Sequence, residues 1–231
     1  MQNNKNGNIT IIVIVLVVSL ILVGVISWLL LKDDEVINQG AFRINDLVVT
    51  STVEAEDKTT DINNWKLNLT QKNHISILVD NEGSNKISNM SIDKIVVEKP
   101  AKLGKLIASP KDNEQVFDIL DATQDIFYVY MKEKDGAYIA EIDIDNKDFI
   151  TDYKVPSDVK EIRYDGTLLN RVSVKPEELK FKVTFNLNII DIQGSISTAK
   201  ITLEMPNQNI IKEGKVVEKI DPKKFAFKIT K

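Results

Sequence analysis

The feature that most constrains this chain is an uncharged, apolar run of 23 residues, from Ile9 to Leu31. At a rise of about 1.5 Å per residue, a helix of this length measures roughly 35 Å, slightly more than the hydrocarbon core of a bilayer. In lipid every backbone amide must be satisfied within the segment, so we expect a helix although Ile and Val dominate the run. The sequence therefore predicts one transmembrane helix over residues 9–31.

The residues around this segment predict an uncleaved anchor. A secretory signal has an apolar stretch of only about 7–15 residues and small residues at its cleavage site, whereas Trp28 to Leu31 are bulky. Lys and Arg divide evenly between the two flanks, but the acidic residues directly after Lys32 and the absence of cysteine favour an internal amino end. We expect a protein of the cell membrane, in contact with the lipid bilayer, with a tail over residues 1–8, a stalk over 32–41 and an extracytoplasmic region over 42–231.

Composition excludes several functions for the extracytoplasmic region. The chain has 34 acidic and 30 basic residues, a net charge of −4, and its lysines are scattered rather than clustered. Binding to nucleic acid needs a field that neutralises phosphates, so we expect no nucleic-acid partner. The absence of cysteine also excludes disulfides, thiolate nucleophiles and zinc-thiolate sites. Stability must therefore come from the burial of apolar side chains.

Alternating apolar residues predict a long hairpin in the second half of the chain. Residues 179–189 place six apolar side chains on one face of a strand and polar ones on the other. At Ile190 and Ile192 the alternation changes parity, which predicts a bulge or bend before Gly194. Residues 199–205 then resume the alternation and form the second strand.

Further strands at short intervals predict an antiparallel β-sandwich. Asp135-Gly136 supplies the positive φ angles of a tight turn within a hairpin over residues 126–145. A third hairpin is expected over residues 75–95, around an Asn-Glu-Gly turn. Other strands are expected over 42–53, 65–69 and 225–229. This spacing predicts a mainly β fold, an immunoglobulin-like or jelly-roll-like sandwich with one short helix. Whether it forms one sandwich or two lobes, 42–108 and 109–231, stays open.

Residues 75–92, "ISILVDNEGSNKISNMSI", resemble a hairpin of immunoglobulin-like modules that are common on bacterial and archaeal surface proteins. The similarity consists of a strand, an N-x-G turn and a second strand. It implies a sandwich fold and assigns no functional residue.

One helix is predicted from Ser109, the expected cap, with Pro110 at the first helical position and Asp112 three residues after the cap. Val116, Phe117 and Leu120 then share one face. We expect this short helix to close one end of the sandwich.

An acidic strand is the main candidate for a site. Glu141, Asp143 and Asp145 fall on one face, and Asp148 lies just beyond. Neighbouring carboxylates repel one another unless a cation neutralises them, so these four residues are candidate calcium ligands, and calcium is the only cofactor that the sequence suggests. The pattern departs from an EF-hand loop, because Lys147 stands at the third ligand position and Asp148 where the turn glycine should be. The alternative is a solvated edge that discourages aggregation.

His74 is the only histidine, and it starts a predicted strand without a second histidine or a cysteine to assist it. We expect a satisfied histidine at the surface or rim. No G-x-S-x-G motif or phosphate-binding loop occurs. The sequence therefore predicts a protein that is not an enzyme.

The predicted membrane location and fold class suggest three functions. The first is a membrane-anchored envelope protein whose sandwich is a non-catalytic binding or scaffold module for a protein or a cell-surface polymer. The second is a pilin-like or secretion-system subunit, because Lys5-Asn6-Gly7 before the apolar run looks like a short leader, although Ile12 stands where that family has a glutamate. The third is an enzyme that acts on cell-wall glycans through a carboxylate pair.

Overall fold

The computed structural model describes residues 40–59, 65–83, 86–99, 101–109, 117–118, 126–161, 170–205 and 215–231. All of them belong to one compact unit. The predicted tail, the predicted transmembrane helix over 9–31 and the stalk up to residue 39 lie outside the described residues. In the part of the chain that is described, no helix has the length and apolar character needed to cross a membrane.

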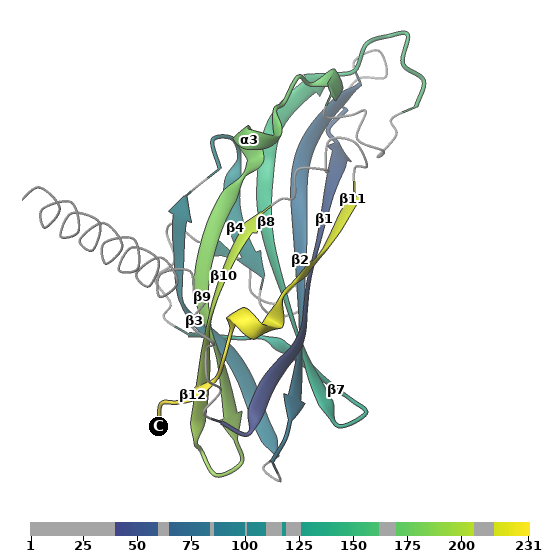
Figure 1. Cartoon of the computed structure of the whole chain (residues 1–231). Helices are drawn as coiled ribbons and strands as arrows, with labels where there is room; N and C mark the ends of the chain where they lie inside the picture. Colours follow the sequence, from purple (N-terminus) through teal and green to yellow (C-terminus); the bar gives the residue numbers. More distant parts are fainter. Residues whose placement is uncertain are drawn as a thin grey trace, which may run out of the picture. The chain divides into compact units, whose positions relative to one another are not determined.

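Two antiparallel sheets form the described fold (Figure 1). Sheet A has the order β11-β1-β2-β8-β4-β5, with β7 also paired to β8, and sheet B has the order β12-β10-β9-β3-β6. The strands of sheet A are β1 (Phe42–Asp57), β2 (Lys66–Asn81), β4 (Lys105–Ser109), β5 (Phe117–Asp118), β7 (Tyr130–Lys134), β8 (Ala137–Lys154) and β11 (Lys215–Ile220). Those of sheet B are β3 (Ile87–Lys99), β6 (Ile126–Tyr128), β9 (Phe181–Asp191), β10 (Ile196–Met205) and β12 (Lys228–Ile229). The mainly β, sandwich-like fold is confirmed.

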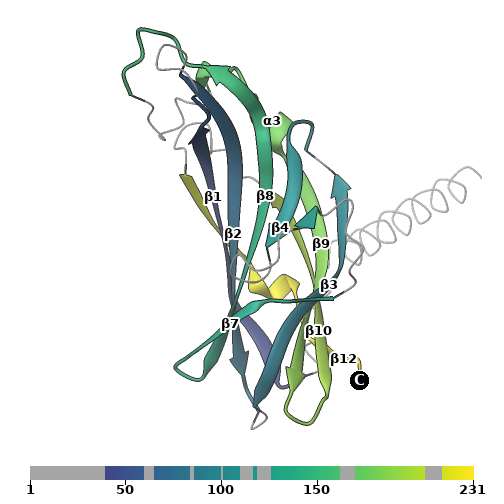
Figure 2. The same ribbon diagram turned by 180° about the vertical axis from the view of Figure 1, so that it is seen from behind.

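Apolar side chains on the inward faces of the two sheets form a shared core. They alternate along each strand with outward polar residues, so each strand buries one face. Figures 1 and 2 show β1, β2 and β8 in one layer and β3, β9 and β10 in the other. The largest fully buried side chains include Leu47, Ile75, Ile77, Met90, Ile92, Ile142, Ile144, Phe181 and Phe185. Strands from both 42–108 and 109–231 contribute to this core and pair with one another in both sheets.

The predicted hairpin in the second half of the chain is confirmed as β9 and β10, with Phe181 opposite Met205. Of the bulge or bend predicted before Gly194, the bulge is wrong, because Ile190 pairs regularly with Ile196, whereas the chain does bend there into its turn. Ile192 is 64% exposed, and Gly194 has a φ of +85°. The change of parity therefore marks the end of the strand and the start of its turn.

The hairpin around Asp135-Gly136 is also confirmed, as β7 and β8. Both turn residues have positive φ angles, 53° and 81°, as a two-residue hairpin loop requires. The residues before β7 differ from the prediction, because β6 pairs with β3 in sheet B. The chain thus passes from sheet B to sheet A at Val129, which is buried between Tyr128 and Tyr130.

The hairpin predicted over residues 75–95 is wrong. Both strands exist, but β2 pairs with β1 and β8, whereas β3 pairs with β9 and β6. The connection after Asn81 therefore crosses from one sheet to the other. This arrangement lets the apolar faces of β2 and β3 meet across the core instead of lying side by side. The immunoglobulin-like hairpin that residues 75–92 resemble is consequently not formed.

The helix predicted from Ser109 is wrong where the structure describes it. Ser109 ends β4, and Phe117 pairs with Ala108 in the two-residue strand β5. Backbone pairing with the free edge of β4 outweighs the weak helical preference of these residues. Residues 110–116 and 119–125 lie outside the described residues. The short α-helix that is described is α3 (Pro176–Leu179), beside a 3-10 turn, η1 (Pro222–Lys224).

The end of the chain forms less strand than predicted. Only Lys228 and Ile229 pair, as β12, with β10. Phe227 is nevertheless fully buried, and its ring meets that of Phe42 edge-on at 6.3 Å. Burial of Phe227 holds this segment against the sandwich together with backbone hydrogen bonds between Ile196 and the residues Thr230 and Lys231.

A belt of buried polar side chains crosses sheet A and divides the interior. Ser51 Oγ and Gln71 Nε2 both donate to Asn73 Oδ1, at 2.6 and 2.9 Å, and Asn73 Nδ2 donates to the carbonyl of Ile144 at 2.8 Å. Asn146 is the fourth buried amide or hydroxyl of the belt. Beyond it lies a second apolar cluster, formed by Val53, Leu67, Leu69, Phe149, Val174, Leu179 and Val216. Inward positions are therefore not uniformly apolar, which alternation alone does not predict.

Candidate functional site

The predicted calcium ligands all lie on β8, but in two different settings. Glu141, Asp143 and Asp145 occupy alternate outward positions, between the buried Ala140, Ile142 and Ile144. Asp148 lies beyond an irregularity at which β8 shifts register against β2. The structure therefore keeps three carboxylates in one row and separates Asp148 from them.

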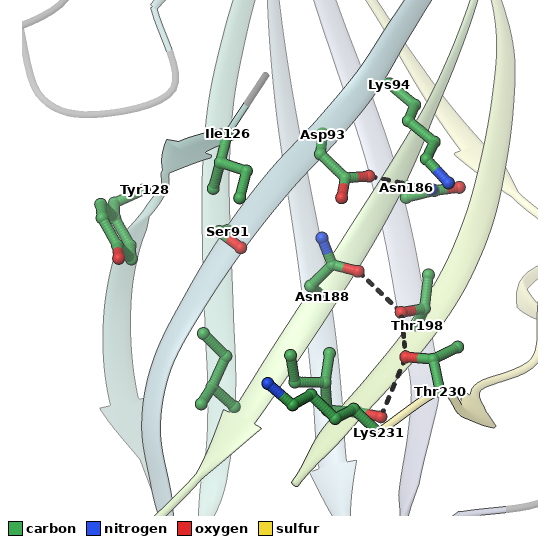
Figure 3. A pocket seen from close by; sticks show the side chains of 12 residues that line it. Ser91, Asp93, Lys94, Ile126, Tyr128, Asn186, Asn188, Thr198, Thr230 and Lys231 are labelled. Carbon is green, nitrogen blue, oxygen red and sulfur yellow. Dashed lines mark hydrogen bonds between the residues drawn. The ribbon is translucent and has the colours of Figure 1, made fainter. Parts of the chain in front are cut away.

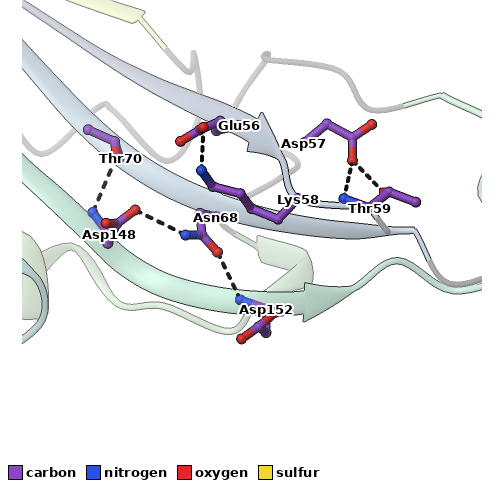
Figure 4. Close-up of polar contacts among 8 residues, drawn as sticks. All are labelled: Glu56, Asp57, Lys58, Thr59, Asn68, Thr70, Asp148 and Asp152. Carbon is purple, nitrogen blue, oxygen red and sulfur yellow. Dashed lines mark hydrogen bonds and ion pairs between the residues drawn. The ribbon is translucent and has the colours of Figure 1, made fainter. Parts of the chain in front are cut away.

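Asp148 has a structural role at this irregularity (Figure 4). Its φ is 51°, a left-handed conformation that short polar residues tolerate. Its backbone N–H donates to Thr70 Oγ1 at 3.2 Å, and its carboxylate accepts from Asn68 Nδ2 at 3.3 Å. The side-chain oxygen Asn68 Oδ1 accepts from the backbone N–H of Asp152 at 3.0 Å. Side chains of β2 thus satisfy backbone groups that the ladder leaves unpaired.

His74 lies opposite Asp143 on the outer face of sheet A, as expected for a satisfied surface histidine. Its Nδ1 is 2.7 Å from Asp143 Oδ1, and its Nε2 is 3.9 Å from Glu141 Oε1. The hydrogen bond with Asp143, together with the charges of Asp143, Glu141 and Asp145, raises the pKa of His74, while partial burial acts against it. The positive form of His74 therefore neutralises part of the acidic row.

Asp145 is the most perturbed carboxylate of the row. Burial raises its pKa to about 6, and the charge of Asp143 acts in the same direction. The backbone N–H of Asn73, which donates to Asp145 Oδ1 at 3.1 Å, and the charge of Lys72 lower the pKa in part. Lys72 in turn pairs with Glu54 at 2.8 Å. These charged side chains therefore interact electrostatically with one another across β1, β2 and β8.

Among the described residues, no group of three or more His, Cys, Asp or Glu side chains is placed to hold a metal ion. Two of the three carboxylates in the row already contact His74, and the third accepts from a backbone N–H. The calcium site at Glu141, Asp143, Asp145 and Asp148 stays a prediction.

A groove on the outer face of sheet B is the better candidate for a binding site (Figure 3). Its volume is about 440 Å³, and it extends over β6, β3, β9 and β10 to the last two residues of the chain. Polar side chains of β3, β9 and β10 line it together with Ile190 and Ile196, and Ile126 and Tyr128 come from the edge strand β6. Its lining residues are Ser91, Asp93, Lys94, Ile126, Tyr128, Asn186, Asn188, Ile190, Ile196, Thr198, Thr230 and Lys231.

Strand register arranges the groove in rows. Tyr128, Ser91, Asn188 and Thr198 are mutual partners on four successive strands. At about 4.8 Å per strand, this row spans roughly 14 Å. In the next row Ile126 pairs with Asp93 and Asp93 with Asn186, whose Nδ2 donates to Asp93 Oδ1 at 2.8 Å. The rows place an aromatic ring at one end of a line of amides and hydroxyls.

Two nearly inaccessible residues of the groove floor each carry a side-chain group without a hydrogen-bond partner within the described part of the chain. These groups are the hydroxyl of Ser91 and the amide nitrogen of Asn188. The other end of the Asn188 amide is fixed, because Thr198 Oγ1 donates to its Oδ1 at 2.7 Å. Figure 3 shows the Asn188 nitrogen directed away from Thr198 and into the groove. Although both residues face outward, Ser91 is only 2% and Asn188 only 7% exposed, so the groove is hollowed at this point.

The other end of the same face is saturated. Thr184 Oγ1 donates to Glu98 Oε1 at 2.6 Å and lies 2.9 Å from Thr202 Oγ1. Lys182 Nζ pairs with Glu98 Oε2 at 2.6 Å, and this contact and the Thr184 hydrogen bond lower the pKa of Glu98. The same strands therefore carry one closed polar network and one open one.

Sequence reasoning missed the groove, although part of its signal was readable. Asn186 and Asn188 occupy outward positions of a strand that was predicted correctly. Ile126 and Tyr128 could not be placed, because their strand leaves the predicted hairpin for sheet B. Thr230 and Lys231 reach the groove only through the fold of the chain end.

No protein-family model, curated protein or solved structure matches this chain. The function must therefore be argued from the site itself.

Proposed function

We propose that this chain is a single-pass, membrane-anchored envelope protein whose β-sandwich lies outside the cell and serves as a non-catalytic binding module. The observation that supports binding is the pair of unpartnered groups, Ser91 Oγ and Asn188 Nδ2, in a hollowed part of an outward face. Neither atom belongs to the fully buried polar atoms without a partner among the described residues, so both stay accessible to a ligand. A ligand that enters the groove would complete them, and the uncharged run over residues 9–31 would hold the module at the membrane.

The finer fold class belongs to the same proposal. In immunoglobulin-like domains some consecutive strands lie in opposite sheets. The passage from β2 to β3 across the core, and that from β6 to β7, are of this kind. Such crossings fit both an immunoglobulin-like and a jelly-roll-like sandwich, because Greek-key connections between two sheets occur in both.

Site-specific photo-crosslinking in cells of the natural host tests the binding function. The full chain would carry p-benzoylphenylalanine in place of Tyr128 or, as the control, of Tyr130. Both tyrosines are exposed, by 50% and 39%, but only Tyr128 lines the groove. We expect a cross-linked macromolecule with the probe at position 128 and none at 130. The absence of adducts at both positions, or equal adducts at both, would contradict the proposal.

The location and orientation in the membrane are tested separately by cysteine labelling. Because the chain has no cysteine of its own, each introduced thiol is the only one that reacts. A Lys134→Cys variant places one thiol on the exposed β7–β8 hairpin, and an Asn3→Cys variant places one in the predicted internal tail. We expect a membrane-impermeant maleimide to label only Lys134→Cys in intact cells. Labelling of Asn3→Cys alone would reverse the orientation.

A further inference from the structure

We infer that the groove on sheet B recognises a neutral saccharide. This inference rests on the proposed binding function and specifies its ligand. It starts from the composition of the row Tyr128, Ser91, Asn188 and Thr198, which contains one phenol ring, two aliphatic hydroxyls and one amide. None of these side chains carries a charge.

The groups of the floor that have no partner are complemented by a ligand that both donates and accepts hydrogen bonds. The Asn188 nitrogen can only donate, the Ser91 hydroxyl can do both, and the Asp93 oxygen that Asn186 does not occupy can only accept. A sugar hydroxyl donates one hydrogen bond and accepts others, so adjacent hydroxyls of one ring can serve all three. The row spacing of about 4.8 Å matches such short, repeated contacts.

Tyr128 supplies the second element of sugar recognition. Its ring is half exposed at one end of the row, and Ile126 on the same edge strand is 57% exposed. The flat tyrosine ring can stack on the C–H face of a pyranose. The hydroxyls at the edge of the sugar would then face the polar groups of the floor. Ile190 and Ile196 provide apolar surface elsewhere in the groove.

The hollowing of the floor disfavours a protein ligand. The core of a protein interface is apolar and closely packed, whereas the deepest groups here are a hydroxyl and an amide. With exposures of 2% and 7%, Ser91 and Asn188 are reached only by slender groups such as a sugar hydroxyl.

Charge restricts the saccharide further. Asp93 contributes a carboxylate to the floor, and Lys94 and Lys231 contribute the positive side chains of the lining. Lys94 comes from an irregularity of β3 and has a φ of 50°, so the backbone departs from the regular strand directly beside Asp93. The lining thus carries charges of both signs and matches neither a strongly acidic nor a strongly basic polymer, and the uncharged row Tyr128, Ser91, Asn188 and Thr198 favours a neutral sugar.

The test is calorimetric titration of the full chain, in a mild detergent, with four neutral hexasaccharides: cellohexaose, maltohexaose, mannohexaose and N-acetylchitohexaose. We expect at least one to bind with a Kd of millimolar or below. Tyr128→Ala and Ser91→Ala should each weaken that binding tenfold or more, whereas Tyr128→Phe should retain it. Tyr130→Ala is the matched control and should bind as the parent chain does. Equal thermal midpoints of the variants would show that folding is intact.

The outcomes separate this inference from the proposed function. No heat with any of the four sugars at millimolar concentration overturns the saccharide inference, as does binding that Tyr128→Ala and Ser91→Ala leave unchanged. If the sugars fail but a probe at position 128 cross-links to a protein in cells, the binding function stands with a different ligand. If both experiments fail, both proposals fall.

Discussion

The outer faces of the two sheets are both polar, but their polar groups are used in opposite ways. On sheet A, His74 contacts both Asp143 and Glu141, and Lys72 pairs with Glu54. In the groove of sheet B, by contrast, the hydroxyl of Ser91 and the amide nitrogen of Asn188 have no hydrogen-bond partner among the described residues. A saturated polar face stabilises its own fold, whereas an open one has hydrogen-bonding capacity left for a ligand.

The difference is visible even along a single strand. Thr184 and Asn188 both face outward from β9, and both are nearly inaccessible. Thr184 is bonded to Glu98 and lies beside Thr202, while the Asn188 amide is held at one end only. Residue type therefore does not distinguish these two positions, whereas their hydrogen bonds and their place on the surface do: Asn188 lines the groove and Thr184 does not.

The largest expected effect comes from removing the support that both ends of this face share. Phe185 is fully buried beneath β9, between the positions of Thr184 and Asn186. Phe185→Ala should lower the free energy of unfolding by about 3–5 kcal/mol through lost burial and an internal cavity. Denaturant unfolding of the full chain measures this. Val217→Ala, at a 61% exposed edge position, is the control and should change little. A loss below about 1 kcal/mol for Phe185→Ala would show that the core is not packed as described.

The next effect concerns Asp145, the carboxylate with a raised pKa on the outer face of sheet A. Because its pKa is about 6 in the folded state and lower when unfolded, the folded protein binds more protons between about pH 4 and 6. Its contribution to stability is therefore lost as the pH rises through this window. Asp145→Asn keeps the acceptor for the Asn73 N–H and removes the buried charge. We expect a gain on the order of 2 kcal/mol at pH 8 and almost none at pH 4. Thermal melts at both pH values measure it, and an equal gain at both would contradict the assignment.

A third pair of variants compares the two ends of sheet B directly. Thr184→Val removes a buried hydroxyl with two partners and should destabilise the fold by about 1 kcal/mol, since it strips Glu98 and Thr202 of a contact. Ser91→Ala removes a buried hydroxyl without a partner and should stay within about 0.5 kcal/mol of the parent. Chemical denaturation of both variants provides the measurement. If Ser91→Ala proves as destabilising as Thr184→Val, the Ser91 hydroxyl already has a structural partner, and the groove loses its strongest support.

The sequence predicts the strands well because their signal is local. Alternation along residues 179–189 and 199–205 specifies two strands and a buried face, and Asp135-Gly136 specifies a turn. Sheet membership is not local. Whether β3 pairs with β2 or lies across the core from it depends on which apolar faces meet, and nothing within residues 75–95 decides that. The same limit explains Phe117, whose pairing with Ala108 depends on a free strand edge.

The candidate sites show the same difference between local and non-local information. Glu141, Asp143 and Asp145 were correctly predicted to share one face, because period-two spacing determines it. Their partners could not be predicted, since His74 reaches Asp143 only through the register of β2 against β8. The groove is less predictable still, because its row joins four strands that are distant in sequence. The spacing of residues along one strand therefore predicts which side chains share a face of the sheet. Which side chains meet to form a site depends on the register between strands, which the sequence does not reveal.

The smallest expected effect comes from His74, and it tests whether the face of sheet A is saturated. The folded-state pKa of His74 is raised, so its contribution to stability is fully present below the unfolded value of about 6.5 and is lost as the pH rises through the folded value. Because the side chain is nearly half exposed, solvent screens the interaction, and the effect should be smaller than that of Asp145. His74→Gln should therefore lower the thermal midpoint slightly at pH 5.5 and leave it unchanged at pH 8.5, and salt should reduce the difference. A larger loss at pH 8.5 than at pH 5.5 would mean that neutral His74 is the stabilising form, and the acidic row would then lack the cation that balances it.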